Sequence, residues 1–443
     1  MEIYKYETNY KRNLFLNKTK ITTKKIFKNP EYQVINVYPE IKYQNFIGFG
    51  GAFTQSSGIN FSKLSNEKKD ALIKDYFSKD GLDYSLGRLT IGSSDFSDKS
   101  YSYSKKPDLS DFSIDEDKNY IIPLIKKAID TKNNLKFLAS PWSPPKFMKS
   151  NKMLVLGGKL LDKYKQTYAD YLVKYIKAYE KENININYIT VQNEPNAVQT
   201  WESCIYTDKE EAEFAIKYLY PTFQNNNINT KIFIWDQNRE KLFTRAISEL
   251  NSNDALKAIS GIAFHWYTGD HFENIKLVSE AFPGKLLFHT EICTGFSHFK
   301  PSEELKNAEM YGHDIIGDLN NGVNAYFDWN LLLDHKGGPN HKLNYCNSPI
   351  MLNNDLADYI KTPTYYYIGH FSKFIKPGAR RIANSKYTDS IEVTSFINPD
   401  NSIAIVLLNR NDYNKEYNLC INGTTIHDNL DSHAIVSLWG RFF

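Results

Sequence analysis

Two glutamates in this sequence each follow a short apolar stretch. Glu194 comes after residues 188–191, which are rich in strand-forming side chains, and Glu291 ends the run 286–291. Pro195 cannot donate to a sheet ladder, so a strand that leads to Glu194 must stop there. Two carboxyl groups held at strand ends are what chemistry at an acetal carbon requires, because one must attack while the other transfers a proton.

Either glutamate, taken alone, is more simply explained as the first residue of a polar loop. The rest of the chain argues against that explanation, because other apolar stretches also end in polar or aromatic side chains. Asp95, Trp142, His265 and Trp329 each follow such a stretch. Parallel barrels place their active sites at the carboxyl ends of their strands. We therefore expect these side chains to gather around the two glutamates.

The region from residue 44 to 375 alternates between strand-like and helix-like patterns. Eight strands are expected, at 46–53, 83–91, 135–139, 188–191, 231–235, 261–264, 286–291 and 322–327. Strands that alternate with helices in this way favour a parallel sheet, and eight of them can close on themselves. The sequence therefore predicts an α/β fold with a (β/α)8 TIM barrel.

Helix boundaries are indicated by capping residues. Ser65 precedes a predicted helix at 66–77, and Thr207 with Glu210 has the spacing of a capping box. Ser302 is expected to cap a further helix. A long helix at 160–182 carries large apolar side chains on one face, which predicts packing against the barrel.

The two ends of the chain have a different pattern. After residue 375, short strands are predicted at 391–397, 403–408, 417–421 and 434–439, separated by Asn, Pro, Asp and Gly. Residues 1–43 hold a few strand-like stretches, such as 21–23 and 32–37, too few for a stable sheet of their own. We therefore expect a small antiparallel β-sandwich domain built from both chain ends, with 1–43 and 376–443 flanking a catalytic barrel at 44–375.

Composition narrows the class of protein. The 443 residues are 41% hydrophobic and 24% charged, and the formal net charge of +3 comes without a basic stripe, which argues against nucleic acid as a partner. A run of about 18 apolar residues is missing, so no membrane span is expected. Residues 1–20 lack the apolar core of a signal peptide, so no signal peptide is expected. The compartment is not predicted, because both a cytoplasmic protein and a processed secreted form fit this pattern. The oligomeric state is not predicted.

The cysteines and one histidine have plain structural explanations. Cys204, Cys293, Cys346 and Cys420 form no metal-binding motif, so free thiols are expected and Cys293 is assigned to packing. His289 is interpreted as one residue off the catalytic face by strand alternation and is expected to pack behind the barrel. No metal or cofactor is predicted.

The two glutamates are expected to have different tasks. Glu291 would be the nucleophile, which must stay ionised and therefore needs hydrogen-bond donors; Arg88, His265 and Tyr267 are candidates. Glu194 would be the general acid/base, and the asparagine before it is suited to binding the sugar 2-hydroxyl. Arg88 is equally well explained as a buried ion-pair partner at a strand end, and both explanations can hold together.

A series of short motifs also runs along the chain in one order. It comprises Gly-Phe-Gly-Gly-Ala at 48–52, Asp-Phe-Ser at 95–97, Ala-Ser-Pro-Trp-Ser at 139–143, Asn-Glu-Pro at 193–195, His-Trp-Tyr at 265–267, Asp-Trp-Asn at 328–330, Gly-Gly-Pro-Asn at 337–340 and Ser-Pro-Ile at 348–350. Asn-Glu-Pro alone is common to a clan of barrel hydrolases, but the whole series is specific. On these motifs the chain resembles glycoside hydrolase family 30, most closely its glucosylceramidase members.

The resemblance implies a role for each matching residue. Glu194 matches the family's acid/base and Glu291 its nucleophile, in a retaining mechanism with a covalent glycosyl-enzyme intermediate. The residues implied to bind the substrate are Asp95, Phe96, Trp142, Asn193, His265, Tyr267, Trp329 and, at the cleft rim, Asn344. The implied partner is a β-glucoside or glucolipid substrate.

Two departures concern the setting and the leaving group. The chain lacks the Cys-rich N-terminal segment and signal sequence of the family's animal members, so their lysosomal setting does not carry over. His341 follows Gly-Gly-Pro-Asn, where glucosylceramidases carry an aromatic residue. We expect the leaving group to lie over a rim that holds Tyr267, Phe296, His298, Phe299 and Tyr345.

Three functions remain open at this point. The first is a β-glucosidase that cleaves glucosylceramide or a related glucoside, and the second is the same chemistry on a β-1,6-glucan or β-xyloside. The third is a carbohydrate-binding barrel without catalysis, which the presence of both Glu194 and Glu291 argues against. The Asp-Trp-Asn and Gly-Gly-Pro-Asn motifs favour the first over the second.

Overall fold

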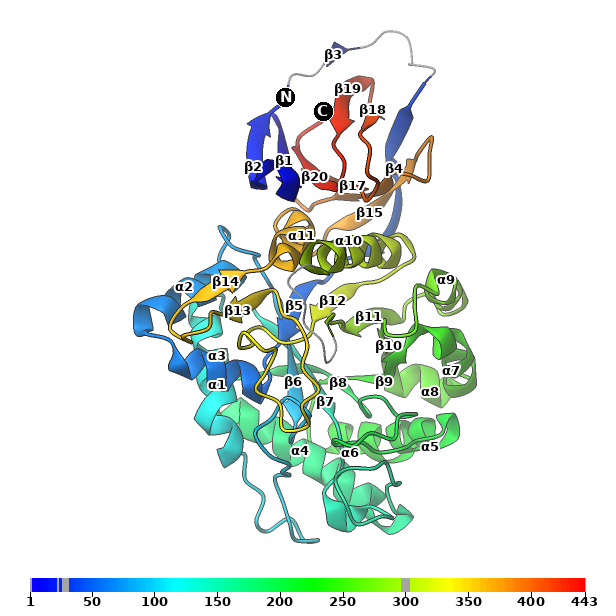
Figure 1. Cartoon of the computed structure of the whole chain (residues 1–443). Coiled ribbons are helices and arrows are strands. Elements are labelled where there is room, and N and C mark those ends of the chain that lie inside the picture. The colour runs from blue at the N-terminus through cyan, green and yellow to red at the C-terminus, as the bar shows by residue number, and fades with distance from the viewer. Residues whose placement is uncertain (1, 22–23, 26–31, 296–302, 443) are drawn as a thin grey trace.

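The computed structural model describes residues 2–21, 24–25, 32–295 and 303–442. A closed barrel of eight strands lies next to a ten-stranded sheet (Figure 1). The first and last strands of the chain lie together in that sheet, and the middle of the chain forms the barrel. The predicted fold class, a (β/α)8 barrel with a β domain built from both chain ends, is confirmed.

The barrel strands are parallel and close in the order β10-β11-β12-β5-β6-β7-β8-β9. They are β5 (Gly48–Ala52), β6 (Leu86–Ile91), β7 (Lys136–Pro141), β8 (Ile186–Thr190), β9 (Lys231–Asn238), β10 (Ile259–His265), β11 (Leu286–Glu291) and β12 (Ala325–Asp328). Buried apolar side chains, among them Leu138, Phe233 and Phe288, fill the interior. Gly50 lies against the Leu86 carbonyl, which a Cβ would approach to 2.3 Å, so β5 can pair this closely only with glycine there.

The helices surround the barrel (Figure 1). They are α1 (Gln55–Lys63), α2 (Asn66–Phe77), α3 (Asp115–Thr131), α4 (Lys165–Lys181), α5 (Asp208–Glu213), α6 (Tyr220–Asn225), α7 (Leu242–Glu249), α8 (Asn253–Ala258), α9 (Phe272–Ala281), α10 (Glu304–Asn320) and α11 (Pro363–Ser372). A π-helical segment (Phe214–Leu219) joins α5 to α6, and short 3-10 turns lie at Tyr10–Arg12, Lys146–Met148, Asp162–Tyr164 and Arg239–Lys241. Of the helices in the described part of the chain, none combines the length and the apolar character that crossing a bilayer demands.

Two of the predicted capping residues are found at the starts of helices. The Ser65 side chain accepts from the backbone N–H of Lys68 at the start of α2, and the capping box of Thr207 and Glu210 is formed at α5. Helix α4 starts later than predicted, at Lys165, because a 3-10 turn precedes it. Ser302, the predicted cap of the next helix, lies outside the described residues.

The ten-stranded sheet has the order β2-β1-β20-β17-β16-β15-β4-β18-β19-β3. Its strands are β1 (Ile3–Asn9), β2 (Leu14–Lys20), β3 (Lys24–Lys25), β4 (Val34–Asn45), β15 (Arg380–Ser385), β16 (Glu392–Ile397), β17 (Ile403–Asn409), β18 (Lys415–Ile421), β19 (Thr424–Leu430) and β20 (Ala434–Gly440); a separate hairpin joins β13 (Ile350–Leu352) and β14 (Tyr359–Lys361). The predicted sheet was wholly antiparallel, but β18 pairs with β4 in parallel. Strands β15 and β19 were not predicted, because their polar side chains hide the apolar alternation.

The sheet packs on the barrel through α10 and α11. Phe396, Leu408 and Ile435 on one face belong to the same buried core as the barrel helices. The opposite face buries Ile405 and Leu407 in a separate core. The barrel is therefore supported on one side by the sheet.

Candidate active site

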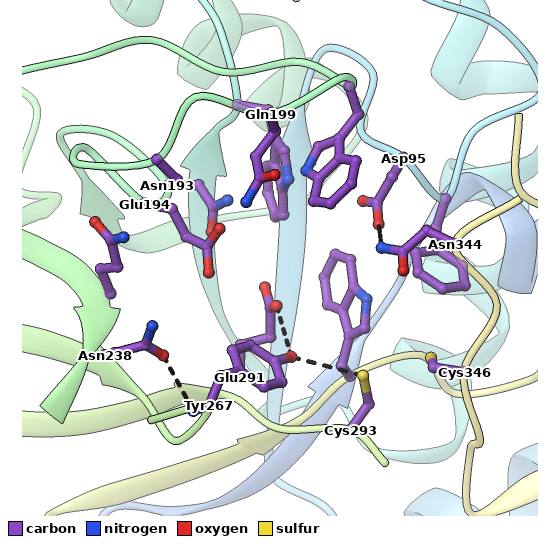
Figure 2. A pocket seen from close by; sticks show the side chains of 16 residues that line it. Asp95, Asn193, Glu194, Gln199, Asn238, Tyr267, Glu291, Cys293, Asn344 and Cys346 are labelled. Atoms are coloured by element: carbon purple, nitrogen blue, oxygen red, sulfur yellow. Dashed lines mark hydrogen bonds between the residues drawn. The ribbon is translucent and has the colours of Figure 1, made fainter. Parts of the chain in front are cut away.

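Glu194 and Glu291 face one cleft at the carboxyl ends of the barrel strands (Figure 2). Glu291 is the last residue of β11, and Glu194 follows β8 with a φ of 49°, which is unusual for a residue with a side chain. The backbone N–H of Glu194 donates to the Asp236 carbonyl (3.0 Å), which holds this conformation. A carboxylate oxygen of each glutamate and a ring nitrogen of His265 all lie within 4.8 Å of one another.

Arg88 on β6 lies beneath the two glutamates and hydrogen-bonds to three side chains around them. Its buried guanidinium donates to Glu291 Oε2 (2.5 Å), to Asp236 Oδ2 (3.0 Å) and to Asn193 Oδ1 (2.9 Å). Both explanations of Arg88 offered by the sequence fit this geometry, because the same side chain forms a buried ion pair and orients Glu291.

Asp236 lies at a β-bulge, where β10 pairs with the residues on either side of it. A bulge re-aims a side chain, and Asp236 accepts hydrogen bonds from Arg88, Thr190 and Thr290. Burial by itself would raise the pKa of this carboxyl, but Arg88 and then His265 outweigh it and hold the pKa well below its usual range. Asp236 is therefore a permanent negative charge under the two glutamates.

Tyr267 supplies the second donor to Glu291. Its hydroxyl donates to Oε1 (2.8 Å; Figure 2). The guanidinium of Arg88 donates to Oε2. Tyr267 is positioned in turn by its backbone N–H, which donates to Asn238 Oδ1 (3.0 Å). Each oxygen of Glu291 is thus paired with a fixed donor, which orients the carboxylate for attack.

His265 at the end of β10 lies between the acidic groups. Its Nδ1 is 3.2 Å from Glu194 Oε1 and 4.0 Å from Glu291 Oε1, and its Nε2 is 3.2 Å from Asp236 Oδ1. Burial would lower the pKa of His265, but Glu291, Asp236 and Glu194 outweigh it and raise the pKa to about 9. The ring is therefore an imidazolium at neutral pH and donates from both nitrogens.

The cleft above the cluster has a volume of about 320 Å³. Trp142 and Trp329 form one wall, with stacked rings whose centroids are 5.4 Å apart, and Phe96 contacts Trp329 edge-on at 5.8 Å. The guanidinium of Arg88 lies 5.0 Å and 5.5 Å from the centroids of the two indoles. These flat faces are suited to the ring of a sugar.

Asp95 and Asn344 form the adjoining part of the cleft. The Asn344 amide donates to Asp95 Oδ2 (3.1 Å), which links the loop after β12 to the loop after β6. Burial, and next the charge of Glu291, raise the pKa of Asp95 well above its usual range, although the Asn344 hydrogen bond acts in the opposite direction. Asp95 thus meets a ligand as a group that can both donate and accept.

Among the residues that the structure describes, two groups place three metal-ligand atoms within 4.8 Å of one another: Glu194, His265 and Glu291, and His289, Asp314 and Asp318. An arginine already pairs with each group. Arg88 contacts Glu291, and Arg239 donates to Asp314 (2.5 Å) and Asp318 (2.7 Å). Glu291, Asp314 and Asp318 are therefore each paired with an arginine of the chain itself.

His289 lies behind the barrel wall, as predicted. Strand alternation alone would place it on the same face as Glu291, but the pairing of β11 with β10 shifts by one residue between the two. Its Nδ1 donates to Asp318 (2.5 Å), and its Nε2 donates to the backbone carbonyl of Glu291 (2.9 Å). Burial would lower the pKa of His289, but Asp318 and Asp314 outweigh it and raise the pKa. The hydrogen bond from His289 fixes the backbone of Glu291 from the side away from the cleft.

Comparison with protein families decides the class of this site. Residues 46–375 match the model described as the glycosyl hydrolase family 30 TIM-barrel domain, and residues 378–438 match the family 30 beta sandwich domain. The chain belongs to glycosyl hydrolase family 30. It is therefore a glycosidase, and the predicted resemblance is confirmed.

Named relatives of this family 30 chain include glucosylceramidases and a glucanase. Putative glucosylceramidase 3 of Caenorhabditis elegans is 38% identical over 81% of this chain and 72% of its own, and lysosomal acid glucosylceramidase of Mus musculus is 34% identical over 85% and 77%. SrfJ from Salmonella typhimurium superposes with a TM-score of 0.97 at 33% identity, covering 100% of both chains. The endo-beta1,6-glucanase BT3312 superposes with a TM-score of 0.90 at 28% identity, covering 100% and 99%.

The structure brings most of the predicted site residues of this family 30 chain to the cleft wall. Those that line it are Asp95, Phe96, Trp142, Asn193, Glu194, Tyr267, Glu291, Trp329 and Asn344. Two others lie elsewhere. Arg88 and His265 are fully buried beneath the glutamates, so His265, expected among the substrate-binding residues, touches the acidic groups and not the cavity.

Several residues of the cleft were not predicted as site residues. They are Ala197, Gln199, Trp201, Gln237, Asn238, Cys293 and Cys346. Gln237 and Asn238 carried the same signal as the predicted residues, since they end β9, but the apolar run stops at Trp235 and hides the longer strand. Trp201 lies in an irregular loop and had no such signal.

The predicted leaving-group rim is described only in part. Phe296, His298 and Phe299 lie outside the described residues. Tyr345 packs its ring against Gly338 and does not line the cavity. Cys293 is buried, as packing predicted, but its sulfur also lies 3.6 Å from the Tyr267 hydroxyl.

Proposed function

We propose that this glycosidase is a retaining β-glucosidase, with Glu291 as the nucleophile and Glu194 as the general acid/base. The observation that carries the proposal is the spacing of the two carboxylates, which have oxygens within 4.8 Å of each other. Retaining glycosidases hold their carboxyl groups about 5–5.5 Å apart, whereas inverting enzymes leave about 6.5–9.5 Å for a water molecule.

The first step joins the glycosyl unit to the protein. A carboxylate oxygen of Glu291 bonds to the anomeric carbon, the bond to the leaving oxygen breaks, and Glu194 gives that oxygen its proton. In the second step Glu194 takes a proton from water, the water oxygen attacks the anomeric carbon, and Glu291 is released. Two displacements at one carbon retain its configuration.

The charges around the glutamates suit this exchange. In the proposed first step Glu291 attacks as a carboxylate and Glu194 gives up a proton, beside the positive Arg88 and His265 and the negative Asp236. After it Glu291 is a neutral ester and Glu194 is negative, so the sum of charges stays the same. The imidazolium of His265 lies within 4.0 Å of an oxygen of each glutamate and can stabilise either charge.

The glycone is proposed to be a β-glucosyl unit on a lipid-like leaving group. The glucosyl ring would lie between Trp142, Trp329 and Asp95, which form one side of the cleft. Support for glucosylceramide comes from relatives of that name at 34–38% identity. The second candidate is a β-1,6-glucan, supported by the structural similarity to BT3312 and by the amide side chains at the other side of the cleft.

The test is a substrate panel with stereochemical readout. Purified protein is given p-nitrophenyl β-glucoside and β-xyloside, glucosylceramide in detergent, and a β-1,6-glucan, and the first anomer released is identified by proton NMR. We expect β-glucose first and fastest turnover on glucosylceramide. Release of α-glucose would refute retention, and faster cleavage of the glucan than of glucosylceramide would refute the lipid substrate.

A further inference from the structure

The end of β9 forms a polar wall beside Glu194 that the proposed chemistry does not use. Gln237 and Asn238 both line the cleft and are only partly buried. Glu194 accepts no bond from them, but its backbone N–H donates to the Asp236 carbonyl immediately before Gln237. The wall is thus attached to the proposed proton donor.

Both amides of this wall are held in one orientation by the backbone. Gln237 Oε1 accepts from the backbone N–H of Asn196 (2.8 Å), and Asn238 Oδ1 accepts from the backbone N–H of Tyr267 (3.0 Å). An amide whose oxygen is bound to an N–H has its nitrogen directed the other way. Among the described residues, neither amide nitrogen has a hydrogen-bond partner, so two N–H donor groups are fixed in advance and unoccupied.

The wall lies on the leaving-group side of the cleft. Figure 2 shows Asn238 and Asp95 at opposite sides, with Glu194 and Glu291 between them. The sugar side holds the stacked indoles and Asp95. An acid that protonates the leaving oxygen must lie next to the leaving group. The backbone of Glu194 is hydrogen-bonded to Asp236, the residue before Gln237.

We infer that Gln237 and Asn238 are specificity-determining residues that select a leaving group with acceptor oxygens close to the glycosidic bond. This inference rests on the proposed function, because it assigns the leaving-group side from the role of Glu194. A second sugar, with ring and hydroxyl oxygens, meets the requirement, and so does a ceramide headgroup, with a hydroxyl and an amide carbonyl. A plain alkyl chain offers no such acceptor.

The third amide of the cleft provides a contrast. Gln199 lines the same cavity, but only its backbone atoms take part in hydrogen bonds with described residues. Among the described residues, no hydrogen bond fixes its amide, so the amide must be ordered on binding, which reduces the gain from any contact. The fixed pair is therefore expected to discriminate more strongly than Gln199.

The experiment compares two substrates that need Glu194 equally. Octyl β-glucoside and glucosylceramide both have poor leaving groups, but only the second carries acceptors near the bond; gentiobiose serves as the disaccharide counterpart. The two test variants are Gln237→Met and Asn238→Asp, and the control variant is Gln199→Met. Asn238→Asp keeps an oxygen that can accept from the Tyr267 N–H. We expect each of the first two to lower kcat/KM on glucosylceramide or gentiobiose about 3- to 10-fold and to leave octyl glucoside within twofold.

The outcomes separate the inference from the proposed function. Equal loss on octyl glucoside and on the acceptor-bearing substrates would overturn the inference, because it would mean damage to Glu194. Unchanged kcat/KM on all substrates would also overturn it. If wild-type protein fails to hydrolyse any β-glucoside, the proposed function itself is wrong. Loss on gentiobiose alone would identify the acceptor as a second sugar, and loss on glucosylceramide alone would identify it as a ceramide.

Discussion

Arg88→Lys tests whether one guanidinium organises the whole catalytic cluster. Arg88 reaches three acceptors that are far apart in the sequence: Glu291 (2.5 Å), Asp236 (3.0 Å) and Asn193 (2.9 Å). Lysine keeps the positive charge, but its ammonium is a compact point donor and does not span three acceptors as the planar fork does. The substitution therefore keeps the positive charge but removes the donor arrangement that contacts three acceptors at once.

The size of the effect follows from the contacts that are lost. A hydrogen bond to a charged group is worth about 1.5–3 kcal/mol, so losing one in the transition state predicts a fall in kcat/KM of about 10- to 150-fold. The loss should appear in kcat more than in KM, because Arg88 does not line the cleft and acts by orienting Glu291. Arg88→Met would instead leave buried charges unpaired and should lower the free energy of unfolding by about 3–5 kcal/mol.

The assay is steady-state hydrolysis of p-nitrophenyl β-glucoside, with urea unfolding measured in parallel. Arg245→Lys is the matched control, because Arg245 is also buried between two carboxylates, Glu211 and Glu249, away from the cleft. That variant should lose stability and keep its kcat. An Arg88→Lys protein with kcat within threefold of wild type would refute the reasoning.

Three further predictions concern other members of the site. Glu194→Ala should lose most activity on glucosides with poor leaving groups, keep much of it on activated aryl glucosides and recover with azide; equal loss on both substrate types would contradict the acid/base role. Asp95→Ala should lower turnover about tenfold, since a buried sugar hydroxyl left without its partner costs about 1–3 kcal/mol, and an unchanged kcat would contradict sugar binding there. The pKa of His265 is about 9 in the folded protein and about 6.5 in the unfolded chain. The imidazolium therefore stabilises the fold by about 3 kcal/mol below pH 6.5, and this stabilisation is lost as the pH rises through 9. The stability gap between wild type and His265→Gln in urea should therefore shrink from pH 6 to pH 9.5; a constant gap would refute the charged ring.

The elements most accurately predicted are those whose local signals agree. The strand 286–291 is apolar up to its final glutamate and forms β11 with those limits, and Ser65 sets the start of α2. In β19, by contrast, His427 and Asp428 interrupt the apolar pattern, and pairing with β18 and β3 makes it a strand. Local patterns therefore predicted the barrel better than the sheet built from the chain ends.

The sequence predicted which residues form the site, but it did not predict the ion pairs and hydrogen bonds between them. The positions of Glu194 and Glu291 at strand ends follow from the sequence, whereas the ion pairs of Arg88 with Asp236 and Glu291 arise only when the barrel closes. The bulge at Asp236 also cannot be seen in the sequence, yet it turns Asp236 inward and lets β9 continue to Asn238. For that reason the polar wall beside the acid was missed.

The most direct test of the account is covalent trapping of the nucleophile. A 2-deoxy-2-fluoro-β-glucoside with an activated leaving group should inactivate the protein with time and add one fluoroglucosyl unit to its mass, because slow hydrolysis of the intermediate lets it accumulate. Peptide mapping should place that unit on Glu291, and Glu291→Gln should not be labelled. A label on any other residue, with Glu291 unmodified, would contradict the assignment on which the mechanism rests.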